Sequence, residues 1–192
     1  MKKMCFAPLI LLACSGLALA QAAAKPVSER RTIQQVLDRA VKNVEQEFVP
    51  AAEAMPEDKY SFAPTSGEFK GVRTFAQQVK HVAASNYEFG AAILGEKPPT
   101  EVGKDENGPD SVKSKAEILK YLNDSFAYVH KAVATIDDKN VVEPMKSPFG
   151  EGTVTRLGMA TLTVGHCFDH YGQMVEYLRM NGIIPPASRN RE

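Results

Sequence analysis

The sequence predicts an all-α protein, a single four-helix bundle with long connections between its helices. Four long stretches repeat apolar residues at steps of three and four, the spacing of a helix that buries one face. No stretch alternates apolar and polar residues over enough positions to predict a sheet. Clusters of glycine and proline separate the four stretches. Because each helix can bury its apolar face only against the others, a bundle follows.

The first two helices are expected at about 28–55 and 72–94. Ser28 is a suitable N-cap for the first helix, and Pro50 could kink that helix near its end. Gly95, followed closely by two consecutive prolines, ends the second helix. Both stretches therefore carry the stop or start signals of helices as well as the periodicity.

The third and fourth helices are expected at about 114–136 and 153–180. Ser114 and Glu117 form a capping-box pattern at the start of the third helix. Gly182, with two prolines after it, ends the fourth. The predicted apolar face of the fourth helix consists of Leu157, Ala160, Val164, Cys167, Tyr171, Met174, Val175 and Leu178.

The connectors at 97–113 and 137–152 are long for a helical bundle. A connector of about 17 residues can span about 50 Å when extended, whereas a helix of about 23 residues is about 35 Å long. Either connector could therefore carry the chain back along the bundle. A simple up-down-up-down order of helices is not required by the sequence.

The first 20 residues have the pattern of a secretory signal peptide. Two lysines follow the initiating methionine, an apolar run comes next, and Ala18-Leu19-Ala20 fits a cleavage site. We therefore expect an exported protein, periplasmic or extracellular. The alternative is a lipid anchor on Cys14, because Leu11-Leu12-Ala13-Cys14 resembles a lipobox.

We expect a short linker at 21–27, a single bundle domain at 28–186 and a tail at 187–192. The chain has 23 basic and 23 acidic residues, so loss of the two leader lysines would leave a slight acidic excess. Without a basic run, the composition argues against a nucleic-acid partner. The mature chain has no apolar stretch long enough to span a bilayer. It keeps Cys167 alone, so no internal disulfide is expected.

His166 and His170 lie four residues apart in the fourth predicted helix. Residues at this spacing share one helix face, so both imidazoles could reach one metal ion. His81, in the second predicted helix, borders an apolar face in the same way. If the two helices border a shared cavity, the three histidines could form a metal site with an open coordination position. Dispersed helix-surface histidines are the alternative.

Three imidazole nitrogens suit a divalent metal, zinc or nickel first, with iron, cobalt or manganese as alternatives. The open position would take water or a substrate, which the metal would acidify or polarise. Ser85 and Glu88 continue the His81 face of the second helix and could line the cavity, although such residues are ordinarily only polar positions on a helix. The residues that carry the reaction itself are not identified by the sequence.

Other chemistry fits the pattern less well. The chain has no His-Glu-x-x-His, which argues against a zincin protease, and no Glu-x-x-His, which argues against a ferritin-like di-iron site. Cys167 points about 100° away from His166, so a buried core thiol is expected. We expect His130 at the surface or boundary of the bundle, and Asp169 as a solvated charge that could otherwise orient a ligand.

The sequence also resembles the DinB-like superfamily, the damage-inducible and YfiT-like metalloenzymes, over nearly all of the mature chain. After the first predicted helix the resemblance is carried by MPEDKY at 55–60 and PT at 64–65. It continues in FAQQVKHVA at 75–83. The last helix and its end carry the rest, with GHCFDHYGQ at 165–173 and YLRMNGIIPP at 177–186.

The resemblance implies a four-helix bundle in which His81, His166 and His170 bind one metal. It also implies that the 97–113 connector runs back along the bundle. Characterised relatives include transferases and isomerases that depend on low-molecular-weight thiols such as bacillithiol or mycothiol, and many members have no known activity. The signal peptide departs from those relatives, because such thiols are made in the cytosol.

We therefore expect an exported metal-dependent enzyme, of the hydrolase type or a transferase of a thiol or another nucleophile, acting on a small molecule. One alternative is a metal-binding or stress-related bundle without turnover, in which the ion joins two helices. Another is a structural bundle that acts as a homodimer.

Overall fold

The four-helix bundle is confirmed by a computed structural model, which describes residues 30–189. The predicted signal peptide, the linker and the Cys14 anchor lie outside the described residues, as do the last three residues of the tail. The bundle belongs to one compact unit that begins at Arg31. Its helices are α1 (Ile33–Ala54), α2 (Phe75–Leu94), α3 (Lys115–Val133) and α4 (Arg156–Met180).

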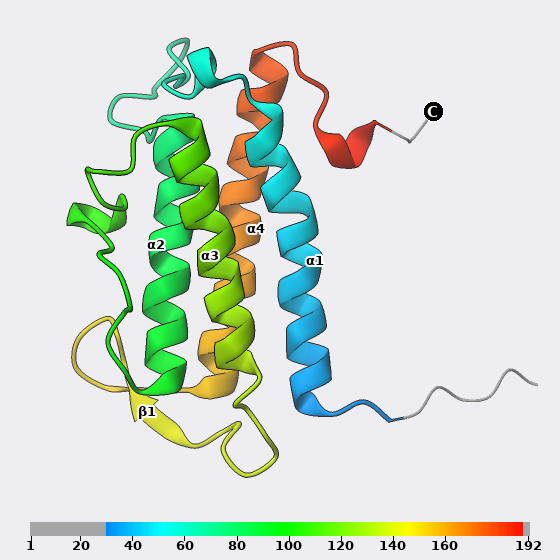
Figure 1. Cartoon of the computed structure of the whole chain (residues 1–192), viewed down its shortest axis with the longest axis vertical. Helices are drawn as coiled ribbons and strands as arrows, with labels where there is room; N and C mark the ends of the chain where they lie inside the picture. The colour runs from blue at the N-terminus through cyan, green and yellow to red at the C-terminus, as the bar shows by residue number, and fades with distance from the viewer. Residues whose placement is uncertain (1–29, 190–192) are drawn as a thin grey trace, which may run out of the picture. The chain divides into compact units, whose positions relative to one another are not determined.

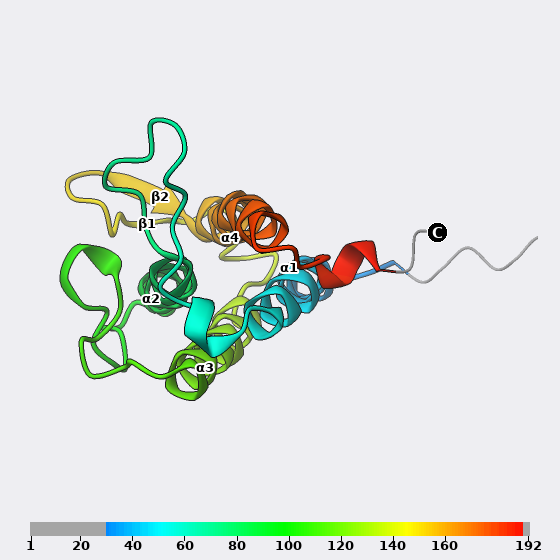
Figure 2. The same ribbon diagram turned by 90° about the horizontal axis from the view of Figure 1, so that it is seen from above.

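The order of the helices differs from up-down-up-down, as the long connectors allowed. Figure 1 shows α1 and α4 running in one direction and α2 and α3 in the other. The connection 95–114 therefore carries the chain back along the bundle. Consistent with this, Nζ of Lys115 at the start of α3 donates to the carbonyls of Glu53 and Met55 at the end of α1. Seen from above, α2 packs against α3 and α4, and α1 lies diagonally across from it (Figure 2).

Capping residues set where the helices begin. Thr32, Thr74 and Ser114 each form a capping box with the residue three positions later. The first helix begins at Ile33, after the predicted start at Ser28, because the box of Thr32 satisfies the first amide groups there. Pro50 lies within α1, which continues to Ala54.

A short hairpin precedes α4, where no strand was expected. It pairs β1 (Pro144–Lys146) with β2 (Thr153–Thr155) in antiparallel register, with Met145 opposite Val154. Strands of three residues are too short to show an alternating pattern in sequence. The predicted start of the fourth helix at 153 is therefore wrong by three residues, since Thr155 caps it instead. The hairpin lies beside α2 and α4 (Figure 2).

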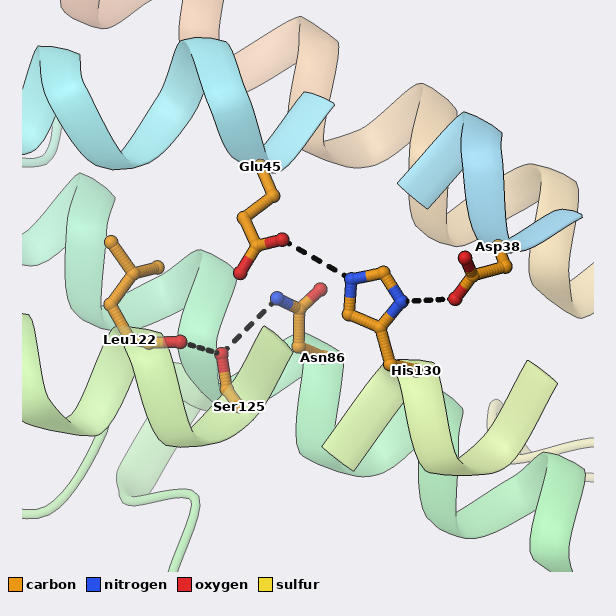
Figure 3. Close-up of polar contacts among 6 residues, drawn as sticks. All are labelled: Asp38, Glu45, Asn86, Leu122, Ser125 and His130. Atoms are coloured by element: carbon orange, nitrogen blue, oxygen red, sulfur yellow. Dashed lines mark hydrogen bonds and ion pairs between the residues drawn. The ribbon is translucent and has the colours of Figure 1, made fainter. Parts of the chain in front are cut away.

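The buried interior contains one polar chain that joins three helices. Asn86 on α2 donates to the hydroxyl of Ser125 on α3, which donates to the carbonyl of Leu122 (Figure 3). The thiol of Cys167 on α4 donates to the Asn86 oxygen at 3.4 Å. Cys167 is fully buried, as predicted, and burial raises the pKa of its thiol to about 12. It is therefore a packing residue and not a nucleophile.

His130, the one histidine outside the predicted site, joins α1 to α3 at the boundary of the bundle. Its Nδ1 lies 2.6 Å from Asp38 and its Nε2 lies 3.2 Å from Glu45 (Figure 3). Both carboxylates belong to α1, so the ring links α3 to α1 at two points about two turns apart. The boundary position predicted for His130 is confirmed, since the residue is half-buried.

Among residues 30–189, the longest helices are all too polar to cross a bilayer.

Candidate metal centre

Three histidines from two helices converge between α2 and α4. One ring nitrogen from each of His81, His166 and His170 lies within 4.8 Å of the others. Nε2 of His81 lies 3.1 Å from Nε2 of His166. The three ring centroids are 4.5 to 5.0 Å apart. The predicted triad is therefore a cluster in space, and His130 takes no part in it.

The buried face of α4 differs from the face that hydropathy predicted, and the difference brings His170 inward. His170 is 7% exposed, while Tyr171 and Val175 on the predicted apolar face are only half-buried. Apolar Leu162 and Phe168 point outward, 41% and 40% exposed. Packing against α2 therefore selects a face of α4 with the polar residues that the site needs. That face contains Met159, Ala160, Thr163, Cys167, His170, Met174, Tyr177 and Leu178.

His81 is oriented by a backbone carbonyl. Its Nδ1 lies 2.9 Å from the carbonyl oxygen of Glu106. A carbonyl can only accept, so Nδ1 carries the proton and donates it. In the neutral ring, Nε2 then has a free lone pair directed toward the other two histidines. The Glu106 carboxylate also lies near, 3.8 Å from Nδ1.

The loop that supplies this carbonyl has an unusual backbone. Glu106 ends the short 3-10 turn η2 (Lys104–Glu106) with φ of 55°, the one positive φ outside glycine in the described chain. A Cβ on Gly103 would overlap the carbonyl of Gly108, so the backbone segments on the two sides of the η2 turn are in direct contact. Lys80, beside His81, donates to the carbonyl of Pro109. The loop is thus tied to α2 at the point where Glu106 meets His81.

His170 is oriented by a chain of side chains that begins at the surface. The Asp169 carboxylate accepts from Nε2 of Gln173 at 3.2 Å. That fixes the Gln173 oxygen toward Gln78, whose Nε2 donates to it at 2.8 Å. The Gln78 oxygen then accepts from Nδ1 of His170 at 2.6 Å. The proton of His170 is therefore on Nδ1, and its Nε2 lone pair faces the cluster.

The third ring, His166, lacks such a partner. Its Nδ1 is buried and has no hydrogen-bond partner among the described residues. The ring packs edge-on against Phe89 of α2, with centroids 5.5 Å apart. Phe149 of the hairpin loop packs in turn on Phe89 at 5.7 Å. The hairpin thus reaches the cluster through one intervening aromatic ring.

Burial keeps all three imidazoles neutral at pH 7. The pKa of His166 is lowered to about 3 and that of His170 to about 4. Burial is the largest cause of both shifts, and repulsion from the neighbouring histidines and from Arg73 contributes the rest of the lowering. The pKa of His81 is also lowered, again mainly by burial. Neutral imidazoles have the lone pairs that a metal requires.

The donor set fits a divalent ion. Tetrahedral zinc with metal–nitrogen bonds of about 2.0–2.1 Å needs its nitrogens about 3.3 Å apart. The His81–His166 separation of 3.1 Å is close to this, and the other two separations are no more than 4.8 Å. Two of the three rings already have their outward Nδ1 hydrogen-bonded, the usual arrangement of histidine ligands.

Two clefts border α2, and none of the three histidines lines either of them. One of about 440 Å³ is bordered by Arg73, Asn107 and the outward partners Gln78 and Gln173. Nε of Arg73 donates to Asn107 at 3.0 Å, and its positive charge contributes to the lowered pKa values of the triad.

The second cleft, of about 870 Å³, lies between α2 and the hairpin and is bordered by Glu88. Glu88 is half-buried, and burial, followed by the charge of Glu106, raises the pKa of its carboxyl. The expectation that Glu88 lines the cavity of the histidines stays a prediction, because none of the three histidines borders this cleft. Ser85 is completely buried and does not border this cleft.

Sequence reasoning identified the three rings but not their supports. Glu106, Gln78 and Gln173 were missed. Gln78 precedes His81 by three residues and Gln173 follows His170 by three, so helix spacing could have placed both beside the triad. The position of Glu106 is set by a loop fold that no local pattern reveals.

Comparison with known proteins places this geometry in context. A family model described as the DinB superfamily matches residues 40–174. A conserved protein from Enterococcus faecalis has a similar structure, with a TM-score of 0.62 and 15% identity over 79% of this chain and 98% of that one. YfiT from Bacillus subtilis, described as a probable metal-dependent hydrolase with an unusual four-helix bundle topology, has a TM-score of 0.56 and 18% identity over 83% and 94%. No curated protein matches the sequence.

Proposed function

The chain belongs to the DinB superfamily, and on that premise we propose that it is a metal-dependent enzyme acting on a small molecule through His81, His166 and His170. The observation that carries the proposal is the direction of the lone pairs. The Glu106 carbonyl and the Gln78 oxygen hold the Nδ1 protons of two rings outward, so both Nε2 atoms face one point. Three neutral nitrogens at one point suit a cation and little else.

A divalent ion in this site would act as a Lewis acid toward a substrate or water in its open coordination position. The protein side chains would supply the rest. Glu106 supplies a carboxylate 3.8 Å from Nδ1 of His81, and burial, followed by the charge of Glu106, raises the pKa of Glu88. A carboxylate with a raised pKa close to the site can accept and return a proton during the reaction. Zinc or nickel is our proposed ion.

We place hydrolysis ahead of thiol transfer as the reaction class. YfiT is described as a probable metal-dependent hydrolase, and export would separate this chain from the cytosolic thiols that transferases use. The alternative is a metal-binding bundle without turnover, monomeric or dimeric, in which the ion only joins α2 to α4. The cleft bordered by Gln78 and Gln173 supports the enzyme, because a small molecule in it would lie against the side chains that orient His170.

The test is metal-dependent turnover of a panel of small esters, amides and phosphoesters by zinc- and nickel-loaded protein. The matched variants are His170→Gln, inside the triad, and His130→Gln, outside it. Turnover by the loaded wild type and His130→Gln, lost in His170→Gln, is the expected result. One bound ion per chain, without turnover of the panel and without thiol transfer in a separate assay with a low-molecular-weight thiol, would favour the non-catalytic alternative.

Export is proposed on the leader sequence alone. Expression of the full chain in a Gram-negative host, followed by fractionation and N-terminal sequencing, should give a periplasmic protein that begins at Gln21. A membrane-bound product with a lipid on Cys14 would favour the anchored alternative. A cytosolic product that begins at Met1 would contradict export in either form.

A further inference from the structure

Two buried polar side-chain atoms in the described chain have no hydrogen-bond partner, Oγ of Ser85 and Nδ1 of His166. We propose that these two atoms are partners when an ion is bound, joined directly or through one water, so that Ser85 is the positioning residue for the third histidine. The inference rests on the proposed metal site and adds a role for Ser85 that the site does not otherwise assign.

The register of α2 against α4 places the two residues opposite each other. Gln78 of α2 bonds to Gln173 of α4. Three residues later on α2 and three earlier on α4, His81 packs on His170 with centroids 4.7 Å apart. Because the helices are antiparallel, one further turn in the same sense brings Ser85 opposite His166.

The ring contacts of His166 agree with that register. Its ring packs against His81 at 5.0 Å and against Phe89 at 5.5 Å, measured between centroids. His81 and Phe89 lie one turn before and one turn after Ser85 on the same face of α2. A ring that touches both neighbours lies over the position between them. Ser85 is fully buried there, with no other partner for its hydroxyl.

Coordination chemistry requires a partner at this point. When Nε2 of a neutral histidine binds a metal, the ring proton must be on Nδ1, and a buried N–H without an acceptor is unfavourable. His81 and His170 have acceptors in the Glu106 carbonyl and Gln78. The Ser85 hydroxyl can accept from His166 after rotation about one bond, and can donate in turn to the carbonyl one turn back in α2. Ser85 would thereby complete a set of three.

The test compares Ser85→Ala with Ser125→Ala. Both changes remove a hydroxyl from a completely buried helix position, but Ser125 bonds to Asn86 and Leu122 and to none of the three histidines. Zinc affinity is measured by competition with a chromophoric chelator, and circular dichroism confirms the fold of each variant. We expect Ser85→Ala to weaken zinc binding by about 10- to 100-fold, the usual effect of losing the outer partner of a histidine ligand. Ser125→Ala should change it by less than about twofold.

A spectroscopic readout separates positioning from general stability. In zinc-loaded wild type, long-range ¹⁵N–¹H spectra of the imidazoles should show a His166 Nδ1 proton that exchanges slowly with water. In Ser85→Ala that proton should exchange faster or shift, whereas it should be unchanged in Ser125→Ala. Ser85→Thr, which keeps the hydroxyl, should retain the wild-type signal.

Failure of the inference and failure of the proposed function give different results. If wild type binds zinc at the triad and Ser85→Ala binds it equally well with an unchanged His166 signal, Ser85 has no positioning role and the metal site stands. If wild type binds no zinc at the triad, both proposals are wrong.

Discussion

The substitution Gln78→Leu tests how the site holds His170. Gln78 is 2% exposed and makes two buried hydrogen bonds, accepting from His170 at 2.6 Å and donating to Gln173 at 2.8 Å. Leucine has a similar volume and no polar atoms. The change therefore removes the acceptor for the His170 Nδ1 proton while it preserves the packing of α2 on α4.

The magnitude follows from the tautomer of His170. Without an acceptor at Nδ1, the proton of the neutral ring can move to Nε2, where it blocks the lone pair that faces the cluster. An ion that binds must then restore the Nδ1–H form and leave that N–H buried without a partner. Loss of such an outer partner typically weakens metal affinity by 10- to 100-fold, or about 1.4 to 2.7 kcal/mol. We predict a change in this range for zinc.

The assay is isothermal titration of metal-free protein with zinc in the presence of a competing chelator, which keeps tight binding within a measurable range. Gln46→Leu is the matched control, because Gln46 is an exposed glutamine on α1. The control should bind zinc like the wild type. If Gln78→Leu also binds zinc like the wild type, then the chain from Asp169 to His170 does not orient the ligand, and the reasoning is refuted.

Three other predictions concern acid, the loop and the thiol. Because burial lowers the pKa values of His166 and His170 to about 3 and 4, the unfolded chain binds more protons below pH 6.5, so metal-free protein should lose stability as pH falls from about 6.5 to 4. Urea unfolding should show a shallower loss in His170→Gln, and equal slopes would contradict the assignment. Gly103→Ala should weaken zinc binding, since its Cβ would displace the loop that carries the His81 acceptor, whereas Gly71→Ala, also at positive φ but in open space, should cost stability alone. Cys167 should not react with a thiol reagent in native protein and should react fully in denaturant, and rapid native labelling would show that it is accessible.

The helices could be predicted from sequence because local signals and packing agree in them. The periodicity identified all four, and Ser114 with Glu117 marked the start of α3 correctly. The start of α4 was predicted too early, because Thr153 to Thr155 pair with a partner strand that is equally short. Whether a segment forms a strand depends on a second segment that pairs with it. A run of three residues is too short to predict that pairing by itself.

The three histidines of the candidate site could be identified from their positions along the sequence. His166 and His170 share a helix face by geometry alone, and His81 borders the apolar face of the second helix. The family resemblance then implied that all three bind one metal. The inward turn of His170 could not be predicted from hydropathy, because Tyr171 offers a more apolar face one residue away. The role of Glu106 depends on the left-handed backbone of a closed loop, which only the folded chain defines. The supports of the ligands therefore needed the structure.

The central claim, one divalent ion held by three histidines, is tested most directly by metal stoichiometry. Protein purified in metal-free buffer is incubated with zinc, freed of excess ion and measured by elemental analysis, as wild type, His170→Gln and His130→Gln. Wild type and His130→Gln should retain about one ion per chain, and His170→Gln should retain much less. Equal, substoichiometric zinc in all three proteins would contradict the account.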